Sequence, residues 1–100
     1  MKIKLCGFFT VSITKFDGIK NQGIHVLMHA VVPLLSLLWM NDDVFLACFI
    51  GSTLVAFGLE TWDGLRKTND DGNPPEGFNI FPDLFFRLIG AFFPVFLVGL

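Results

Sequence analysis

Apolar residues dominate three stretches of this chain, at residues 24–40, 44–62 and 81–100. A helix needs about 20 residues to cross the hydrocarbon core of a bilayer, and the second and third stretches reach that length. The first stretch is shorter and contains Pro33. We therefore predict an all-α fold, a three-helix transmembrane bundle with membrane helices over these ranges, in a single domain of residues 1–100.

Polar residues separate the three stretches. Asn41–Asp43 is short enough for a tight turn, so the first two helices are expected to form an antiparallel hairpin. The segment Asn69–Asn79 contains two prolines and two glycines and is predicted to be a loop. Pro82 suits the first turn of the third helix, where its missing N–H group costs nothing.

The segment of residues 1–20 precedes the first apolar stretch and has a different pattern. Its apolar residues recur at roughly helical spacing, and two lysines share another face. These residues are Leu5, Phe9, Ile13 and Phe16, with Lys4 and Lys15. The pattern favours an amphipathic helix that lies in the interface of an anionic membrane. A strand or a disordered terminus is the alternative.

The composition agrees with a membrane protein. The chain is 53% hydrophobic and 16% charged, with a mean hydropathy of +0.66. A soluble domain of 100 residues would have too little interior to bury so much apolar surface. The net charge of −2 gives no reason to expect a nucleic-acid partner. Cys6 and Cys48 are far apart, and Cys48 lies in the second apolar stretch, so no disulfide framework is expected.

The positive charges predict the orientation of the chain in the membrane. All seven lie toward one side of the predicted bundle, and the Asn41–Asp43 turn carries none. They are Lys2, Lys4, Lys15, Lys20, Arg66, Lys67 and Arg87. The positive-inside rule makes that side cytoplasmic. We therefore expect an integral protein of a bacterial inner membrane, with its N terminus inside and its Asn41–Asp43 turn and C terminus outside.

Six ionisable residues lie in or beside the apolar stretches, and the predicted topology brings them to one depth. We call this set the polar cluster, and its members are His25, His29, Glu60, Asp63, Asp83 and Arg87. The two histidines lie near the start of the first helix, and Glu60 and Asp63 lie at the end of the second. Asp83 and Arg87 lie near the start of the third. Ionisable groups at membrane depth are costly and are therefore candidates for a functional site.

Each predicted helix has one small or polar stripe, which in membranes normally faces other helices. The stripes contain His25, His29 and Ser36 on the first helix, Thr53, Ala56, Glu60, Asp63 and Lys67 on the second, and Asp83, Arg87, Gly90 and Pro94 on the third. Pro33 cannot donate to the carbonyl group of His29, which is therefore free for another partner.

The polar cluster admits several interpretations. A lipid phosphate headgroup could bind to Arg87, Lys67 and the histidines. Alternatively, a divalent metal could bind to His25, His29 and Glu60, although no cofactor is certain from the sequence. The third possibility is a purely structural network, in which Arg87 neutralises Asp83 and Glu60 pairs with a histidine.

The order of these motifs resembles that of the VanZ-like membrane proteins and their short YfiM-like relatives. His25 is followed by Gly58-x-Glu60-x-x-Asp63, by Gly77-Phe78, and by Asp83-x-x-x-Arg87-x-x-Gly90, over about residues 21–95. The resemblance implies a helical bundle and a role in the cell envelope, such as glycopeptide resistance. The family has Asn at the position of Arg87, and it often has Asp-Lys where Asn21-Gln22 stand here.

Three kinds of function remain open. The first is an envelope protein, or a vestigial enzyme, that binds membrane lipids through its polar cluster. The second is an interaction protein without enzymatic activity, such as a small subunit or a phage-encoded inhibitor of a host membrane complex, which acts through its phenylalanine-rich outer faces or by self-association. The third is a holin-like pore former, although the chain lacks the charged tail with which holins usually end.

Overall fold

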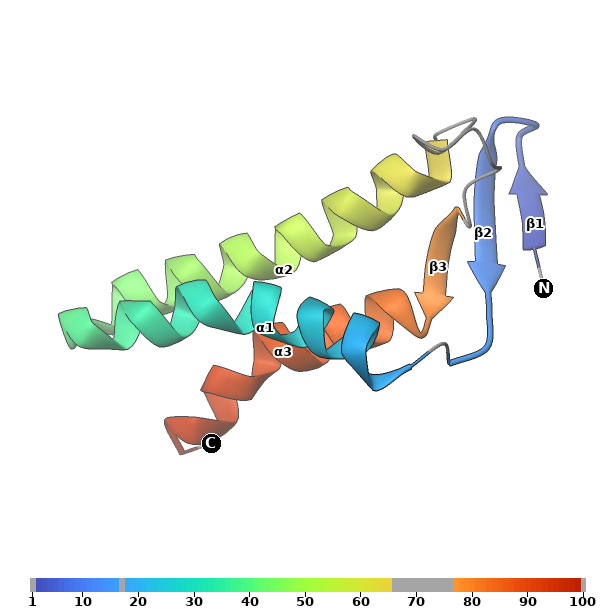
Figure 1. Cartoon of the computed structure of the whole chain (residues 1–100). Coiled ribbons are helices and arrows are strands. Elements are labelled where there is room, and N and C mark those ends of the chain that lie inside the picture. Colours follow the sequence, from blue (N-terminus) through green and yellow to red (C-terminus); the bar gives the residue numbers. More distant parts are fainter. Residues whose placement is uncertain (1, 17, 66–76, 100) are drawn as a thin grey trace.

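A computed structural model describes residues 2–16, 18–65 and 77–99 of the chain. It is mostly helical and contains a small sheet (Figure 1). The elements are β1 (Lys2–Leu5), β2 (Phe9–Ile13), α1 (Ile19–Ser36), the 3-10 helix η1 (Leu37–Trp39), α2 (Asp42–Leu65), β3 (Phe78–Phe81) and α3 (Asp83–Leu97). The prediction of an all-α fold is therefore right about the three principal helices. It is wrong in that the structure also contains a small sheet.

The sheet lies at one end of an elongated molecule of 45 × 27 × 24 Å (Figure 1). Helices α1 and α3 begin near the sheet, and α2 runs back toward it, so the ends of all three helices meet there. The turn between α1 and α2 lies at the far end. This arrangement confirms the expected hairpin of the first two helices.

The N-terminal segment forms a β-hairpin, so the prediction of an interfacial helix over residues 1–20 is wrong. Strands β1 and β2 pair antiparallel, with Leu5 opposite Phe9. Gly7, with a φ of 80°, supplies a left-handed conformation in the turn between them. Leu5, Phe9 and Ile13 are four residues apart, and this even spacing also places residues on one face of a strand. The β-branched residues nearby favour the extended form.

Strand β3 joins the sheet from far along the chain. It pairs parallel with β2, with Val11 opposite Phe78 and Ser12 opposite Asn79. Asn79 is therefore part of a strand, and the third helix begins at Asp83 rather than at residue 81. Apart from residues 77–79, the predicted loop Asn69–Asn79 lies outside the described residues, as do Arg66 and Lys67.

The sheet rests on the end of α2, where a glycine permits close contact. A methyl group added to Gly64 would lie 2.6 Å from the ring of Phe9 and 3.1 Å from the Cβ atom of Phe78. The rings of Phe9 and Phe78 themselves pack at 5.8 Å between centroids. This packing fixes β3 beside the last turns of α2.

The helices pack through small residues. Ala30, Ala56 and Ala91 are buried, and a methyl group on Gly90 of α3 would overlap the backbone carbonyl group of Val26 on α1. Most large apolar side chains point outward instead, among them Leu38, Trp39 and Phe96. Small residues inside and large apolar residues outside are typical of helices that pack in lipid.

Two helical segments are long and apolar enough to cross a membrane. They are Ile19–Trp39, in which η1 continues α1, and Asp42–Leu65. Helix α3 is equally apolar but contains 15 residues, which span about 22 Å at a rise of about 1.5 Å per residue. Of the three predicted membrane helices, two therefore have the required length.

Candidate functional site

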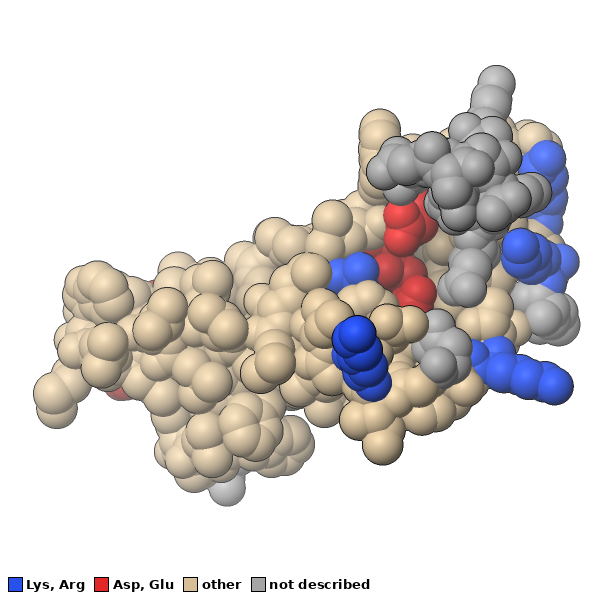
Figure 2. All heavy atoms as spheres, viewed as in Figure 1, with Lys and Arg blue, Asp and Glu red and all other residues tan. Residues whose placement is uncertain are grey.

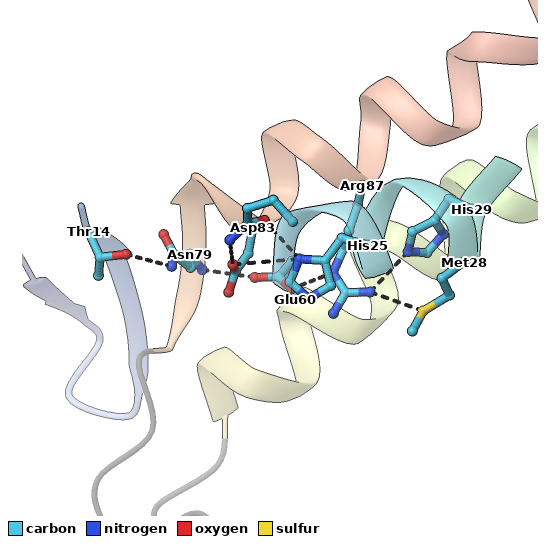
Figure 3. Close-up of polar contacts among 9 residues, drawn as sticks. Thr14, His25, Met28, His29, Glu60, Asn79, Asp83 and Arg87 are labelled. Atoms are coloured by element: carbon cyan, nitrogen blue, oxygen red, sulfur yellow. Dashed lines mark hydrogen bonds and ion pairs between the residues drawn. The ribbon is translucent and has the colours of Figure 1, made fainter. Parts of the chain in front are cut away.

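Glu60 lies at the centre of the polar cluster and connects three elements (Figure 3). Its side chain is fully buried near the end of α2. Oε2 accepts a hydrogen bond from Nε of Arg87 on α3 at 2.9 Å, and Oε1 accepts one from the backbone N–H group of Asn79 on β3 at 3.1 Å. One carboxylate thus fastens α2 both to α3 and to the sheet.

Arg87 continues the network toward α1. The residue is 7% exposed, and its Nη1 atom lies 2.9 Å from Nε2 of His29 and 3.4 Å from Sδ of Met28. A guanidinium group only donates hydrogen bonds, so Nε2 of His29 must be the acceptor. The His29 ring is therefore neutral in this arrangement, with its proton on Nδ1.

The backbone carbonyl group of His29 accepts a hydrogen bond from outside its own helix, as the sequence predicts. Pro33 supplies no N–H group four residues later, and Ser52 Oγ on α2 donates to this carbonyl oxygen at 2.6 Å. Ser52 was not among the predicted site residues. The signal that could have found it is its position one turn before Ala56, on the buried stripe of α2.

A second polar group lies closer to the surface, between the first turns of α1 and α3. Nε2 of Gln22 donates to Oδ1 of Asp83 at 3.1 Å, and Nδ1 of His25 lies 3.0 Å from Oε1 of Gln22 and 3.7 Å from the same oxygen of Asp83. The side chains of His25 and Asp83 are 18% and 19% exposed. Gln22, which is buried one turn before His25, was not among the predicted site residues.

The prediction that Arg87 neutralises Asp83 is wrong, because the carboxylate that Arg87 contacts is that of Glu60. Asp83 is directed to Gln22 and His25 of α1, whereas the longer side chain of Arg87 reaches Glu60 of α2 (Figure 3). The expectation that Glu60 pairs with a histidine fails for the same reason, since Arg87 lies between Glu60 and His29.

The sheet is tied to the cluster through Asn79, a residue that the sequence analysis placed in a loop. Its Nδ2 atom donates to Oγ1 of Thr14 at 3.0 Å, while its backbone N–H group binds Glu60. Asp63 of the predicted cluster lies half-buried three residues beyond Glu60, nearer the end of α2. The structure thus gathers the helix ends that carry the six residues, but the contacts among them differ from those predicted.

The residues expected to bind a metal do not fit one in this arrangement. Among the residues that the structure describes, no group of three or more His, Cys, Asp or Glu side chains is placed to hold a metal ion. The guanidinium group of Arg87 lies between His29 and Glu60, and a fixed positive charge there opposes a cation.

The polar cluster contains three carboxylates and one guanidinium group, and exposed lysines lie elsewhere on the surface. Glu60 pairs with Arg87, and Asp83 faces His25. Four exposed lysines instead surround the sheet and the start of α1, namely Lys2, Lys4, Lys15 and Lys20. In Figure 2 the basic side chains gather on the half of the molecule that carries the sheet. The sequence contains no Lys or Arg between residues 21 and 65.

Comparisons with known proteins add no relative to this picture. No family model matches the chain, and no significant match was found among curated proteins or among solved structures. The resemblance to VanZ-like proteins therefore stays a prediction from the motifs alone.

Proposed function

We propose that this chain is a small integral membrane protein of the cell envelope that binds the phosphate headgroups of anionic lipids at its sheet-bearing end. The observation that supports this function best is the position of four exposed lysines, with Lys2 and Lys4 in β1, Lys15 just after β2 and Lys20 in the first turn of α1. Lysines near an anionic leaflet each contribute about 1 kcal/mol of attraction. By the positive-inside rule, the sheet-bearing end is cytoplasmic.

In this proposal the hairpin takes the interfacial role that the sequence analysis assigned to a helix. Apolar side chains alternate with the lysines and are strongly exposed. They include Ile3 at 49%, Leu5 at 49%, Phe8 at 63% and Ile19 at 81%. Because successive side chains of a strand point to opposite faces, β1 has one basic and one apolar face, and such an edge suits the boundary between headgroups and acyl chains.

The polar cluster then has a structural role inside the protein. Both carboxylate oxygens of Glu60 are occupied, and Arg87 is engaged by Glu60 and His29. A group that has no surplus positive charge offers little attraction to a phosphate. The cluster therefore holds the helices and the sheet in place, while the exposed lysines contact the headgroups.

Lipid enrichment around the purified full chain tests this function. The protein is reconstituted in vesicles of phosphatidylcholine with a minor share of phosphatidylglycerol, and the retained lipids are measured by mass spectrometry. We expect retained lipid to be enriched in phosphatidylglycerol. Replacement of all four lysines by Gln should abolish this enrichment, and replacement by Arg should preserve it.

A soluble competitor separates lipid from free phosphate as the ligand. Glycerol 3-phosphate should leave the enrichment unchanged if the membrane surface is what the lysines recognise. The proposal fails if the wild type and the Gln variant retain the same lipids, or if the protein remains outside the vesicles.

An interaction protein is the second candidate, and the outer face of α2 favours it. Ala47 and Gly51 are four residues apart, and Gly58 follows two turns after Gly51 on the same face. No heavy atom lies within 4 Å of a methyl group built on Gly51 or Gly58. Small residues spaced in this way permit close helix association in membranes. Loss of a crosslinked dimer or hetero-complex in Gly51→Leu would support this candidate.

A further inference from the structure

An open apolar groove lies between the end of α1 and the start of α2, far from the polar cluster. Its volume is about 260 Å³, and it is lined by Val32, Leu35, Ser36, Trp39, Val44 and Cys48. Ser36 contributes the only hydroxyl group of this wall, and its Oγ atom donates to the carbonyl oxygen of Pro33 at 2.6 Å. The groove therefore presents an almost purely apolar surface to its occupant.

The groove exists because the chain turns sharply where small side chains face each other. Helix α1 ends in η1, and Met40 adopts a left-handed conformation with a φ of 51°. This turn sends α2 back along α1, and Ser36 and Cys48 leave space between the two helices. Trp39, which is 67% exposed, borders the groove at its outer end.

The position of the groove indicates what surrounds it. Both helices belong to the segments that are long and apolar enough to span a membrane. With the sheet-bearing end inside, the groove lies in the outer half of the bilayer, just below the Asn41–Asp43 turn. Hydrocarbon chains are the apolar molecules available at that depth.

The charge beside the groove indicates which headgroup fits. The first turn of α2 carries Asp42 and Asp43, both exposed, and no Lys or Arg occurs between residues 21 and 65. Oδ1 of Asn41 already caps this helix, because it accepts from the backbone N–H groups of Asp43 and Val44 at 2.8 and 3.2 Å. The two carboxylates attract an ammonium group, and a primary ammonium can also donate hydrogen bonds to them, which a quaternary ammonium cannot.

We propose that the groove binds one acyl chain of a phospholipid whose headgroup carries a primary ammonium, with the ammonium at Asp42 and Asp43. The inference rests on the membrane orientation of the proposed function. It adds a second lipid site, in the opposite leaflet and with the opposite headgroup preference.

Photo-crosslinking in vesicles tests the site. The full chain is reconstituted with phosphatidylethanolamine that carries a diazirine in its acyl chain, and the crosslinked residues are mapped by mass spectrometry. We expect crosslinks to concentrate within residues 32–48, at several times the yield of the matched phosphatidylcholine probe. Equal yields from the two probes, or crosslinks spread evenly over all outward-facing helix positions, would overturn the proposal.

Two variants separate the groove from the surrounding lipid. Cys48→Phe fills the groove and should lower the crosslink yield at least about threefold, whereas Ile50→Phe, on the outward face of the same helix, should not. Asp42→Asn with Asp43→Asn changes only exposed groups, so folding is preserved, and it should remove the preference for the ammonium headgroup. An unchanged preference in this double variant contradicts the proposal even if Cys48→Phe fails to fold.

The lysine-to-Gln variant distinguishes this inference from the proposed function. It should lose enrichment of phosphatidylglycerol and retain the crosslinks at the groove. In the wild type, enrichment of phosphatidylglycerol without crosslinks at the groove would reject only the groove site. Crosslinks at the groove without this enrichment would reject only the headgroup function of the lysines.

Discussion

Nε of Arg87 donates to Oε2 of Glu60 at 2.9 Å, and this ion pair joins α3 to α2 where both are buried. Removal of one member leaves the other charge without its partner in a medium that cannot solvate it. Removal of one member should therefore destabilise the bundle more than its lost contacts alone would suggest, because the remaining charge stays buried without a partner.

We expect Glu60→Gln and Arg87→Gln each to lower the free energy of unfolding by about 3 kcal/mol, and the double variant to lower it by much less than the sum. Thermal denaturation in detergent measures all four proteins. As a comparison, Asp83→Asn combined with Arg87→Gln should show a smaller departure from additivity, because the described contacts of Asp83 are with Gln22 and His25 and not with Arg87. Additive losses for Glu60 and Arg87 would contradict the network.

The hydrogen bond from Ser52 to the His29 carbonyl group leads to a second prediction. Ser52→Ala should cost about 1 kcal/mol, the usual order for a hydrogen bond between membrane helices. In a Pro33→Ala background the helix regains an N–H group for that carbonyl oxygen, so the additional cost of Ser52→Ala should fall toward zero. The test compares the cost of Ser52→Ala in the wild type with its cost in the Pro33→Ala background. This comparison cancels the effect of the small cavity that Pro33→Ala itself leaves. The same cost in both backgrounds would show that the carbonyl group does not connect the two residues.

The three helices, and the meeting of their cluster-bearing ends, could be predicted because they depend on simple patterns along the chain. Apolar runs set the helix positions, and the distribution of Lys and Arg placed one end of all three helices together. The freed carbonyl group of His29 was also predictable, because proline four residues later removes a specific donor. Each of these features follows from residue types along the chain and does not depend on which side chains meet in the fold.

The pairing within the cluster was not predictable from the same patterns. Whether Arg87 turns to Asp83 or to Glu60 depends on the rotation of α3 against α2, which no local pattern specifies. The parallel contact of β3 with β2 is likewise non-local, and the hydrogen bond from Asn79 to Thr14 joins residues 65 positions apart. The N-terminal hairpin was not predicted for another reason, because a spacing of four residues fits both a helix and a strand.

The crossing of α1 and α3 gives a third prediction. A methyl group on Gly90 would overlap the backbone of Val26, which cannot move without shifting α1. Gly90→Ala should therefore destabilise the bundle by about 1–3 kcal/mol through overpacking. Gly58→Ala is the matched control, because nothing lies within 4 Å of that methyl group and alanine is the better helix former. Melting temperatures of the two variants in the same detergent should fall only for Gly90→Ala, and equal behaviour would place this helix contact elsewhere.

The orientation in the membrane gives the last prediction, and the chain carries its own reporter. Cys6 lies exposed in the hairpin at the sheet-bearing end, whereas Cys48 lies near the opposite end in the apolar groove. In a Cys48→Ala protein, Cys6 should react with a membrane-impermeant maleimide only after the cells are opened, because the lysines hold that end inside. In a protein with Cys6→Ser, Cys48→Ala and Asn41→Cys, the residue at 41 should react in intact cells, since the turn is exposed and faces outward. Labelling of Cys6 in intact cells, with residue 41 protected, would reverse the topology and place the lysines on the outer surface.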